Sequence, residues 1–513
     1  MDNREIDLID LSADYVRPQE NVNNENVYIK RPDVDSVSLD SNVENDFIGL
    51  GSYEEEKPLI TLEQQTVMNS MNKYENKRVL LMNTVAGTGS VGRLVTGLYD
   101  ALSQRGYECL IAFGRDEAPK GYNCYRIGTD FDVYVHGAMS RLNDKHGFYS
   151  KRATKEFIDV IEDFDPDIIH IHNVHGYYLN IEVFFKYLKE SKRRVIWTLH
   201  DCWTFTGHCS HFEYIGCNKW QTGCYKCEQL NEYPKSMGKD NSIFNYKKKK
   251  ELFTGLENVT LVTPSQWLKE RVSQSFMREY HTVVVPTGID LTQFSPIEES
   301  VEEGNLIFKL RNSLNIRGKK MLLGVANPWR ERKGLLQFQN LAKTLDDNYV
   351  IVLLGLNDSQ LNDLPESIVG LAHTDSVAEL AALYSMADIY VNLTLEDTFP
   401  TTNLEALACG TPVITYRTGG SPEAVRDEFS DGSKEFSFDS AQDKRQVSGG
   451  TELYNTGMVI EQGNVVALAN AVMQMKDKPL SSADCRKRAE ELFDKDKCFE
   501  KYVELYEELV NGK

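Results

Sequence analysis

The chain has 513 residues, of which 41 % are apolar and 26 % are charged. Since a typical domain has roughly 150 residues, this length predicts more than one folding unit, with cores large enough to need no disulfide bonds. Its 57 Lys and Arg against 77 Asp and Glu give a net charge of −20. This negative net charge argues against non-specific electrostatic binding of nucleic acid, which requires clustered positive charge.

Residues 1–76 are predicted to be an acidic, partly disordered N-terminal extension. They contain 17 acidic and 6 basic side chains. No long stretch has the spacing of apolar residues that is typical of a helix or a strand, so burial of apolar surface would not offset the entropy lost on ordering. The start, MDNREIDLID, lacks the basic and apolar segments of a secretory signal. We therefore expect a cytoplasmic protein whose 10 Cys are free, metal-bound or buried.

From Lys77 the pattern becomes that of a doubly wound α/β unit. An apolar run at Arg78–Asn83 is followed by a glycine-rich loop and by helical spacing over Arg93–Gln104. Further strands are expected at Glu108–Phe113, Ile168–His172, Arg194–Leu199 and Val259–Val262, and helices at Thr154–Glu162 and Val183–Glu190. Runs that are apolar on both faces suit a parallel sheet buried on both sides.

The glycine loop Gly87–Gly92 (GTGSVG) is a candidate phosphate site. Glycines at Gly87 and Gly89 let the backbone approach a ligand, and the N-terminus of the following helix favours an anion. A tight turn that needs no ligand fits the same residues. The loop lacks the Gly-Lys-Ser/Thr ending of an ATP-type P-loop, which disfavours a kinase or an NTPase.

A second cycle of strands and helices follows the polar and charged segment Asp290–Lys319, which is predicted to be an inter-domain linker plus a helix. Strands are predicted at Met321–Ala326, Tyr349–Gly355, Ile389–Leu393 and Pro412–Tyr416, and helices at Gly334–Thr344, Val377–Met386, Thr402–Ala408, Val465–Met475 and Ala483–Val510. The acidic stretch Asp427–Gly450 reads as an exposed insertion. The pattern predicts an α/β protein with two Rossmann-like domains, at residues 77–286 and 287–490, that face each other across a cleft. Residues 491–513 are expected to be a C-terminal helix that packs back on the first domain.

Two carboxylates eight positions apart, Asp397 and Glu405, bracket a loop and the first turn of a helix. The loop carboxylate can reach sugar hydroxyls, and the helix carboxylate can accept both hydroxyls of a ribose. Between them, the amides of Thr401 and Thr402 lie at a helix N-terminus, where a diphosphate would be stabilised. The alternative is a helix with an acidic first turn and no ligand.

Three cations, Arg330, Arg332 and Lys333, follow the predicted strand Met321–Ala326. Positive charge at a strand end suits a leaving diphosphate. A solvated helix start is the alternative.

These segments resemble the retaining GT-B glycosyltransferases of family 4 (group 1), over roughly residues 77–510. The segments that carry the resemblance are Glu396–Pro412, Gly419–Glu423, Val285–Asp290, Asp167–His175 and Trp197–Cys209, and the last two are most like the colanic-acid type of bacterial polysaccharide enzymes. The acidic pair of the family falls on Asp397 and Glu405, with Glu396 one position earlier, so either neighbouring carboxylate can be the one that reaches the sugar. The usual arginine position holds Pro328, which leaves Arg330 or Arg332 to supply the guanidinium beside Lys333.

The resemblance implies a retaining hexosyltransferase that needs no cofactor for catalysis. It would move a sugar from a nucleotide-diphosphate-sugar donor to a hydroxyl of a surface polysaccharide or of its lipid-linked precursor. It also implies that His200 and Asp397 act at the transferred sugar and that Glu405 holds the ribose. Two alternatives stay open, namely a sugar-nucleotide epimerase of related architecture and a non-catalytic carbohydrate-binding protein.

Histidines and cysteines form two further groups. His170, His172 and His175 could ligate a metal, but the resemblance calls for none there, and we expect them to line the acceptor side. Four thiols that end in Cys-x-x-Cys can hold a structural zinc ion, with His208 or His211 as substitutes, and a reduced loop without metal fits equally well; they are Cys209, Cys217, Cys224 and Cys227. This loop is expected to lie over the acceptor side of the cleft.

Two basic runs, Lys186–Arg194 and Lys247–Lys250, could make weak peripheral contact with anionic lipid at the inner face of the membrane. A solvated helix face is the default interpretation of such runs.

Overall fold

The structure is a computed structural model that describes residues 77–300, 305–426, 445–447 and 450–511. The predicted acidic extension at 1–76 lies outside these residues, as does most of the predicted insertion at 427–450. Two parallel-rich Rossmann-like sheets are present, as the sequence predicted.

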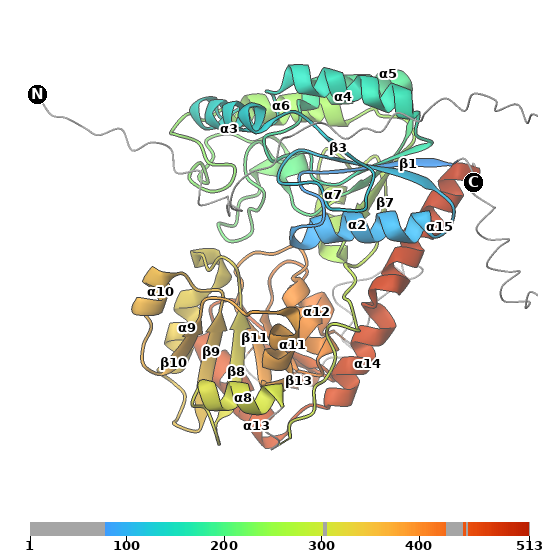
Figure 1. Cartoon of the computed structure of the whole chain (residues 1–513). Coiled ribbons are helices and arrows are strands. Elements are labelled where there is room, and N and C mark those ends of the chain that lie inside the picture. The colour runs from blue at the N-terminus through green and yellow to red at the C-terminus, as the bar shows by residue number, and fades with distance from the viewer. Residues whose placement is uncertain (1–76, 301–304, 427–444, 448–449, 512–513) are drawn as a thin grey trace, which may run out of the picture. The chain divides into compact units, whose positions relative to one another are not determined.

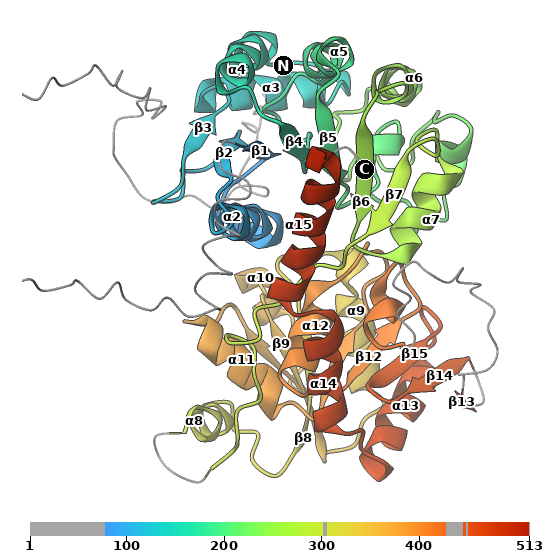
Figure 2. The same cartoon turned by 90° about the vertical axis from the view of Figure 1, so that its right-hand side faces the viewer.

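Among the described residues, the first sheet has seven parallel strands in the order β3-β2-β1-β4-β5-β6-β7. Figure 1 labels β1, β3 and β7 of this sheet, and Figure 2 labels all seven. The strands are β1 (Arg78–Asn83), β2 (Glu108–Phe113), β3 (Cys124–Arg126), β4 (Ile168–Ile171), β5 (Arg194–Thr198), β6 (Val259–Thr263) and β7 (His281–Val284). The central strands are buried almost throughout, because helices cover both faces. The helices of this half are α2 (Gly89–Ser103), α3 (Asp130–Asn143), α4 (Lys151–Phe164), α5 (Ile181–Ser191), α6 (Ser242–Phe253) and α7 (Gln266–Gln274).

The second sheet has eight strands among the described residues, in the order β10-β9-β8-β11-β12-β15-β14-β13. They are β8 (Lys320–Val325), β9 (Tyr349–Leu354), β10 (Ile368–Leu371), β11 (Ile389–Asn392), β12 (Val413–Tyr416), β13 (Arg445–Val447), β14 (Thr451–Tyr454) and β15 (Gly457–Ile460). All pairings are parallel except β13–β14 and β14–β15. The accompanying helices are α8 (Leu306–Ser313), α9 (Leu335–Ala342), α10 (Asp358–Asn362), α11 (Val377–Met386), α12 (Thr401–Ala408) and α13 (Val465–Asp477).

The helix expected at Ala483–Val510 is interrupted, and this part of the prediction is wrong. It consists of α14 (Ser482–Leu492) and α15 (Lys495–Asn511). At the break, the N–H of Ile289 donates to the carbonyl of Phe493 at 2.7 Å, and the N–H of Lys495 donates to the carbonyl of Ile289 at 3.1 Å. The segment that leaves the first sheet therefore captures the backbone groups that a continuous helix would use internally.

After this break α15 packs against α2 of the first half (Figures 1 and 2). Tyr502, Val503 and Tyr506 of α15 join Val95 and Leu98 of α2 in one buried cluster. In the part of the chain that the structure describes, no helix combines the length and the apolar character needed to cross a membrane.

Candidate active site

A cavity of about 370 Å³ lies at the carboxyl ends of β5, β8 and β11 and at the N-termini of α2 and α12. Parallel α/β sheets bind their ligands at this position. The first half contributes Ser90, Val91, Leu94, His200, His211 and Pro264 to the lining, and Thr287 comes from the segment that joins the two halves. The second half contributes Val325, Ala326, Asn327, Trp329, Arg332, Lys333, Phe338, Val391, Asn392, Leu393, Asp397, Thr398, Phe399, Pro400, Thr401 and Thr402.

Lys333 and Asp397 form an ion pair on the wall of this cavity. Lys333 Nζ lies 2.7 Å from Asp397 Oδ2. Burial by itself would raise the pKa of Asp397, but the neighbouring basic side chains, Lys333 first among them, together hold this pKa below its usual value. The site therefore presents a carboxylate and an ammonium side by side at neutral pH, and an anionic ligand can compete for the ammonium.

The structure separates the two neighbouring carboxylates that the sequence left as alternatives. Asp397 lines the cavity, whereas Glu396 is not part of the lining. Glu396 Oε2 accepts a hydrogen bond from the N–H of Tyr214 at 3.4 Å, and its Oε1 lies 3.9 Å from Arg332 Nη1. Asp397 is thus the carboxylate that a ligand in the cavity would meet.

The three basic residues that were predicted to bind a diphosphate do not all reach the cavity. Arg332 and Lys333 line the cavity, whereas Arg330 does not. All three belong to a short turn after β8, where Arg330 precedes a 3-10 helix formed by Glu331–Lys333. Gly334 follows it with a φ of 84°, and a Cβ there would lie 2.2 Å from the carbonyl of Leu393. This glycine lets the turn lie directly against the end of β11.

Helix α12 begins in the cavity wall with Thr401 and Thr402. Its first backbone N–H groups are not used inside the helix, and they favour negative charge. Glu405 lies one turn further on, outside the lining, where its Oε2 accepts a hydrogen bond from the Tyr384 hydroxyl at 2.8 Å. Burial raises the pKa of Glu405.

The glycine loop borders the cavity through Ser90 and Val91, and Leu94 follows in the same helix. Ser90, Val91 and Leu94 are in the lining, whereas Gly87 and Gly89 are not. Both glycines have positive φ, 74° and 63°, and a Cβ on Gly89 would meet no neighbour within 4 Å. The loop therefore presents the start of α2 to the cavity.

His200 lines the cavity from the end of β5. Its Nε2 lies 3.0 Å from Nδ1 of His172, and burial lowers the pKa of His200 to about 4. The imidazole is therefore neutral at physiological pH. In the same cluster, His170 contacts the Tyr506 hydroxyl of α15 and lies 2.8 Å from Thr198 Oγ1. The cavity lining includes neither His170, His172 nor His175.

Direct hydrogen bonds join the two halves beside the cavity. The Thr398 hydroxyl donates to the carbonyl of His200 at 2.7 Å, and the Ser265 hydroxyl donates to the carbonyl of Thr398 at 2.9 Å. Glu423 accepts the backbone N–H groups of Gln266 and Trp267, at 2.9 and 2.8 Å, and so caps the N-terminus of α7. Burial raises the pKa of Glu423 to about 7.

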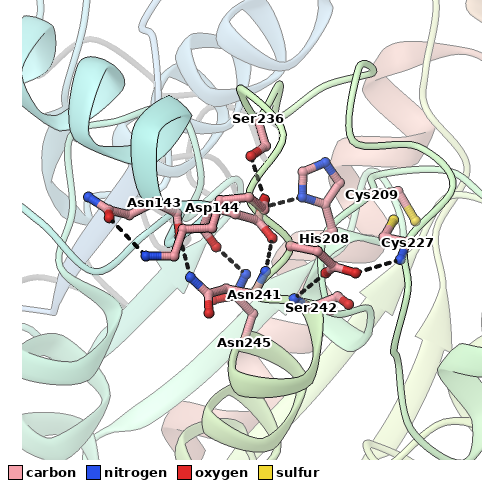
Figure 3. A network of polar contacts seen from close by, with 12 residues as sticks. Asn143, Asp144, His208, Cys209, Cys227, Ser236, Asn241, Ser242 and Asn245 are labelled. Carbon is pink, nitrogen blue, oxygen red and sulfur yellow. Dashed lines mark hydrogen bonds and ion pairs between the residues drawn. The ribbon is translucent and has the colours of Figure 1, made fainter.

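The cysteine-rich loop supplies His211 to the cavity, a contribution that sequence reasoning missed because it considered this residue only as a metal ligand. Burial lowers the pKa of His211 to about 4. Figure 3 shows the sulfur atoms of Cys209 and Cys227 side by side near the buried pair of Asp144 and His208. In the described residues no group of three or more His, Cys, Asp or Glu side chains is arranged so as to hold a metal ion. The zinc prediction therefore stays a prediction.

Two family models match the chain, one in each half. The model of glycosyltransferase family 4 matches residues 91–293, and the model of glycosyl transferases group 1 matches residues 307–492.

Two relatives match parts of the chain. The putative colanic acid biosynthesis glycosyl transferase WcaC of Escherichia coli is 25 % identical over 278 residues, which cover 51 % of this chain and 62 % of that protein. The alpha-monoglucosyldiacylglycerol synthase of Streptococcus pneumoniae is 32 % identical over 168 residues, which cover 30 % of this chain and 37 % of that protein. The chain thus spans less than two thirds of the length of either relative.

Solved structures share the fold. Sucrose-phosphate synthase from Thermosynechococcus elongatus superposes with a TM-score of 0.58 at 16 % identity, covering 85 % of this chain and 100 % of that one. HepE of Anabaena, solved in complex with UDP-glucose, superposes with a TM-score of 0.55 at 13 % identity, covering 84 % of this chain and 99 % of that one. At such identities the likeness establishes the GT-B fold.

Proposed function

Because this chain belongs to the GT-B glycosyltransferases of family 4, group 1, we propose that it transfers a sugar from a nucleotide-diphosphate-sugar donor to a hydroxyl group of an acceptor. The observation that carries this proposal is the wall of the cavity, where Lys333 and Arg332 lie with the N-terminus of α12. Two cations and a set of free backbone amides match a diphosphate in charge and in hydrogen bonding.

In this proposal the cavity wall stabilises the departing diphosphate. Negative charge grows on the phosphate oxygen as the bond from the anomeric carbon to that oxygen breaks. Lys333, Arg332 and the amides of Thr401 and Thr402 are already in place to meet this charge, so little reorganisation is needed. Asp397 would bind hydroxyls of the sugar once the diphosphate takes over Lys333, and Glu405 would hold the ribose.

We further propose that the anomeric configuration is retained. The acceptor oxygen forms its bond to the anomeric carbon on the face that the diphosphate leaves, and the acceptor proton passes to a phosphate oxygen of the leaving group. His200 is neutral, and it would hold the sugar by a hydrogen bond rather than by charge. The hydrogen bonds that join the halves at Thr398 and Glu423 close the site beside the cavity, which would limit hydrolysis of the donor by water.

The names of the relatives suggest the acceptor class. WcaC is a putative colanic acid biosynthesis enzyme, and the streptococcal relative is a synthase of a glycolipid. We propose a hydroxyl of a surface polysaccharide or of its lipid-linked precursor as the acceptor, which would bring the protein into weak contact with the inner face of the membrane. HepE binds UDP-glucose, so uridine nucleotides are the first donors to test.

The test is a panel of UDP-, GDP- and ADP-sugars scored by thermal shift and by release of nucleoside diphosphate with and without a lipid-linked saccharide. The proposal predicts that one nucleotide class stabilises the protein and that release depends on the acceptor. Conversion of the donor without an acceptor would identify an epimerase instead. Absence of binding by every nucleotide sugar would leave a non-catalytic carbohydrate-binding protein.

A further inference from the structure

The segment between Trp203–Phe205 and α6 has little regular structure. Of its described residues, only Lys219–Gln221 form a short 3-10 helix. Irregular loops of this length are uncommon inside compact domains unless something other than secondary structure orders them. Phe212 and Trp220 stack with ring centroids 4.7 Å apart, and this small aromatic cluster is flanked by four cysteines.

The four cysteines of this loop lie close together. The thiols of Cys209 and Cys227 share a hydrogen bond, and their sulfur atoms are side by side in Figure 3. Cys209 also interacts electrostatically with Cys217 and Cys224. Lys226, inside the Cys-x-x-Cys, has a φ of 44°. This backbone conformation closes the Cys224–Cys227 segment into a tight turn.

Two of the sulfur atoms accept backbone hydrogen bonds. Cys224 Sγ accepts the N–H of Gly207 at 3.1 Å, and Cys227 Sγ accepts the N–H of Gln229. A Cβ on Gly207 would lie 2.6 Å from Cys224 Cβ, so glycine is needed for this approach. Because N–H groups that donate to sulfur favour the thiolate over the thiol, this backbone is suited to charged sulfur ligands.

Buried polar groups surround the thiols. Lys249 is 1 % exposed, and it interacts electrostatically with Cys209 and Cys224. His208 is 2 % exposed, is paired with Asp144 through Nδ1, and has no hydrogen-bond partner at Nε2 among the described residues. The amine of Lys249 could take up a proton when thiolates form beside it, and its charge would then offset that of a metal held by several thiolates, which otherwise costs free energy in a low-dielectric site.

We propose that Cys209, Cys217, Cys224 and Cys227 bind one structural zinc ion. Zn²⁺ replaces the four thiol protons, which pass to solvent, and four Zn–S bonds form. The sulfur atoms do not converge on one point in the described structure. Binding therefore includes rotation of cysteine side chains and replaces the Cys209–Cys227 hydrogen bond by metal–sulfur bonds.

The metal would fix a loop that reaches the cavity. Between Cys209 and Cys217, His211 lines the cavity and Glu213 accepts the indole N–H of Trp267 at 3.1 Å. In the same stretch, the Tyr214 hydroxyl donates to Glu331 at 2.7 Å. Zinc would thus set the position of one wall of the site. This consequence rests on the proposed function, whereas the metal site itself does not.

Metal content of the full-length protein tests the site without any activity measurement. Protein purified without added metal and without chelator should contain about one zinc per chain by mass spectrometry of the element. Titration with a mercurial should release that zinc, and cobalt substitution should give an intense thiolate-to-metal absorption band. Absence of zinc together with four thiols that react freely, or a mass that shows a disulfide within the loop, would overturn the proposal.

Variants identify the ligands. Cys217→Ala, Cys224→Ala and Cys227→Ala should each lose most of the zinc, whereas the control Cys124→Ala, at a buried cysteine in β3, should keep it. Zinc retained by Cys217→Ala at the wild-type level would contradict the four-cysteine set. If the ligand variants do not fold, the mercurial and cobalt measurements on the wild type still decide the matter.

Discussion

Lys333 can pair with Asp397, which lies 2.7 Å away, or with the diphosphate of a bound donor. A diphosphate carries more negative charge than one carboxylate and accepts more hydrogen bonds, so it can displace Asp397 from the ammonium. The displaced carboxylate is then available to sugar hydroxyls. This exchange would couple recognition of the diphosphate to recognition of the sugar at the scale of two side chains.

Lys333→Ala should therefore impair both steps. We expect kcat/KM for the donor to fall by about 100-fold, in the range found when one preorganised group that stabilises a transition state is removed. Steady-state release of nucleoside diphosphate measures this. Lys343→Ala, at the end of α9 and outside the cavity lining, serves as the control, and equal rates in the two variants would refute the role of Lys333.

Glu405 accepts a hydrogen bond from the Tyr384 hydroxyl, at 2.8 Å. Tyr384→Phe removes this bond but leaves the carboxylate, and a single hydrogen bond contributes roughly 1 kcal/mol. We expect KM for the donor to rise about fivefold with little change in kcat, whereas Glu405→Ala should reduce donor affinity much further. Calorimetric titration of the donor into both variants compares their donor affinities. A lower donor affinity in Tyr384→Phe than in Glu405→Ala would contradict the prediction.

The sequence identifies only part of the lining. Asp397, Lys333 and Thr401 follow from local spacing, because each lies at a strand end or a helix start. His211 could not be found in this way, since its place depends on an irregular loop that folds over the cavity from the other half. The choice between Glu396 and Asp397 also needed the structure, because the direction of a loop side chain is set by Tyr214 and Arg332, which are distant in sequence.

At the scale of elements, Glu423 joins the turn after β12 to the N-terminus of α7. Burial raises the pKa of Glu423 to about 7, above roughly 4.3 for an unfolded glutamate. The folded state therefore binds this proton more tightly. The contribution of Glu423 to stability is fully present below about pH 4 and is lost as the pH rises through 7.

Glu423→Gln should remove this pH dependence. The wild type should lose up to roughly 3 kcal/mol from this group between pH 4 and pH 7, whereas the variant cannot lose a proton there. Melting temperatures measured across this range should show a shallower slope for Glu423→Gln than for the wild type. The exposed control Glu366→Gln should follow the wild type, and identical slopes in all three proteins would refute the assignment.

Central strands were the most predictable elements. β1 and β2 have the predicted bounds, because strands buried on both faces are continuous apolar runs. The short edge strands β3 and β10 were missed, since they are only 3 and 4 residues long and β10 includes a glycine. The break between α14 and α15 was also missed, because Ile289, about 200 residues earlier in the chain, provides the hydrogen bonds that replace the helical ones.

For the whole molecule, the two chain segments that pass between the halves, near Ile289 and near Lys495, contact each other. Lys495 Nζ lies 2.6 Å from Asp290 Oδ2, next to the backbone bonds at Ile289. A Cβ on Gly288 would lie 2.4 Å from the Cα of Lys495. Gly288 thus permits backbone-to-backbone contact between the two crossings.

Gly288→Ala should push apart the two chain segments that pass between the halves. The added methyl group meets backbone rather than a movable side chain, so we expect a loss of about 1–3 kcal/mol of stability and a lower melting temperature. Gly137→Ala is the matched control, because a Cβ there meets Tyr177 only at 3.7 Å and lies in a helix, where alanine is favoured. A Gly288→Ala protein as stable as the control would show that the backbone contact between Gly288 and Lys495 does not contribute to stability.

The central claim is that one cavity, shared by the two halves, holds the diphosphate of a nucleotide sugar. Crystals of the protein grown with a nucleotide sugar that stabilises it test this most directly. The account predicts diphosphate oxygens within hydrogen-bond distance of Lys333 Nζ and of the backbone amides at Thr401 and Thr402, with Asp397 released from Lys333. A donor bound elsewhere, with the Lys333–Asp397 pair intact, would contradict it.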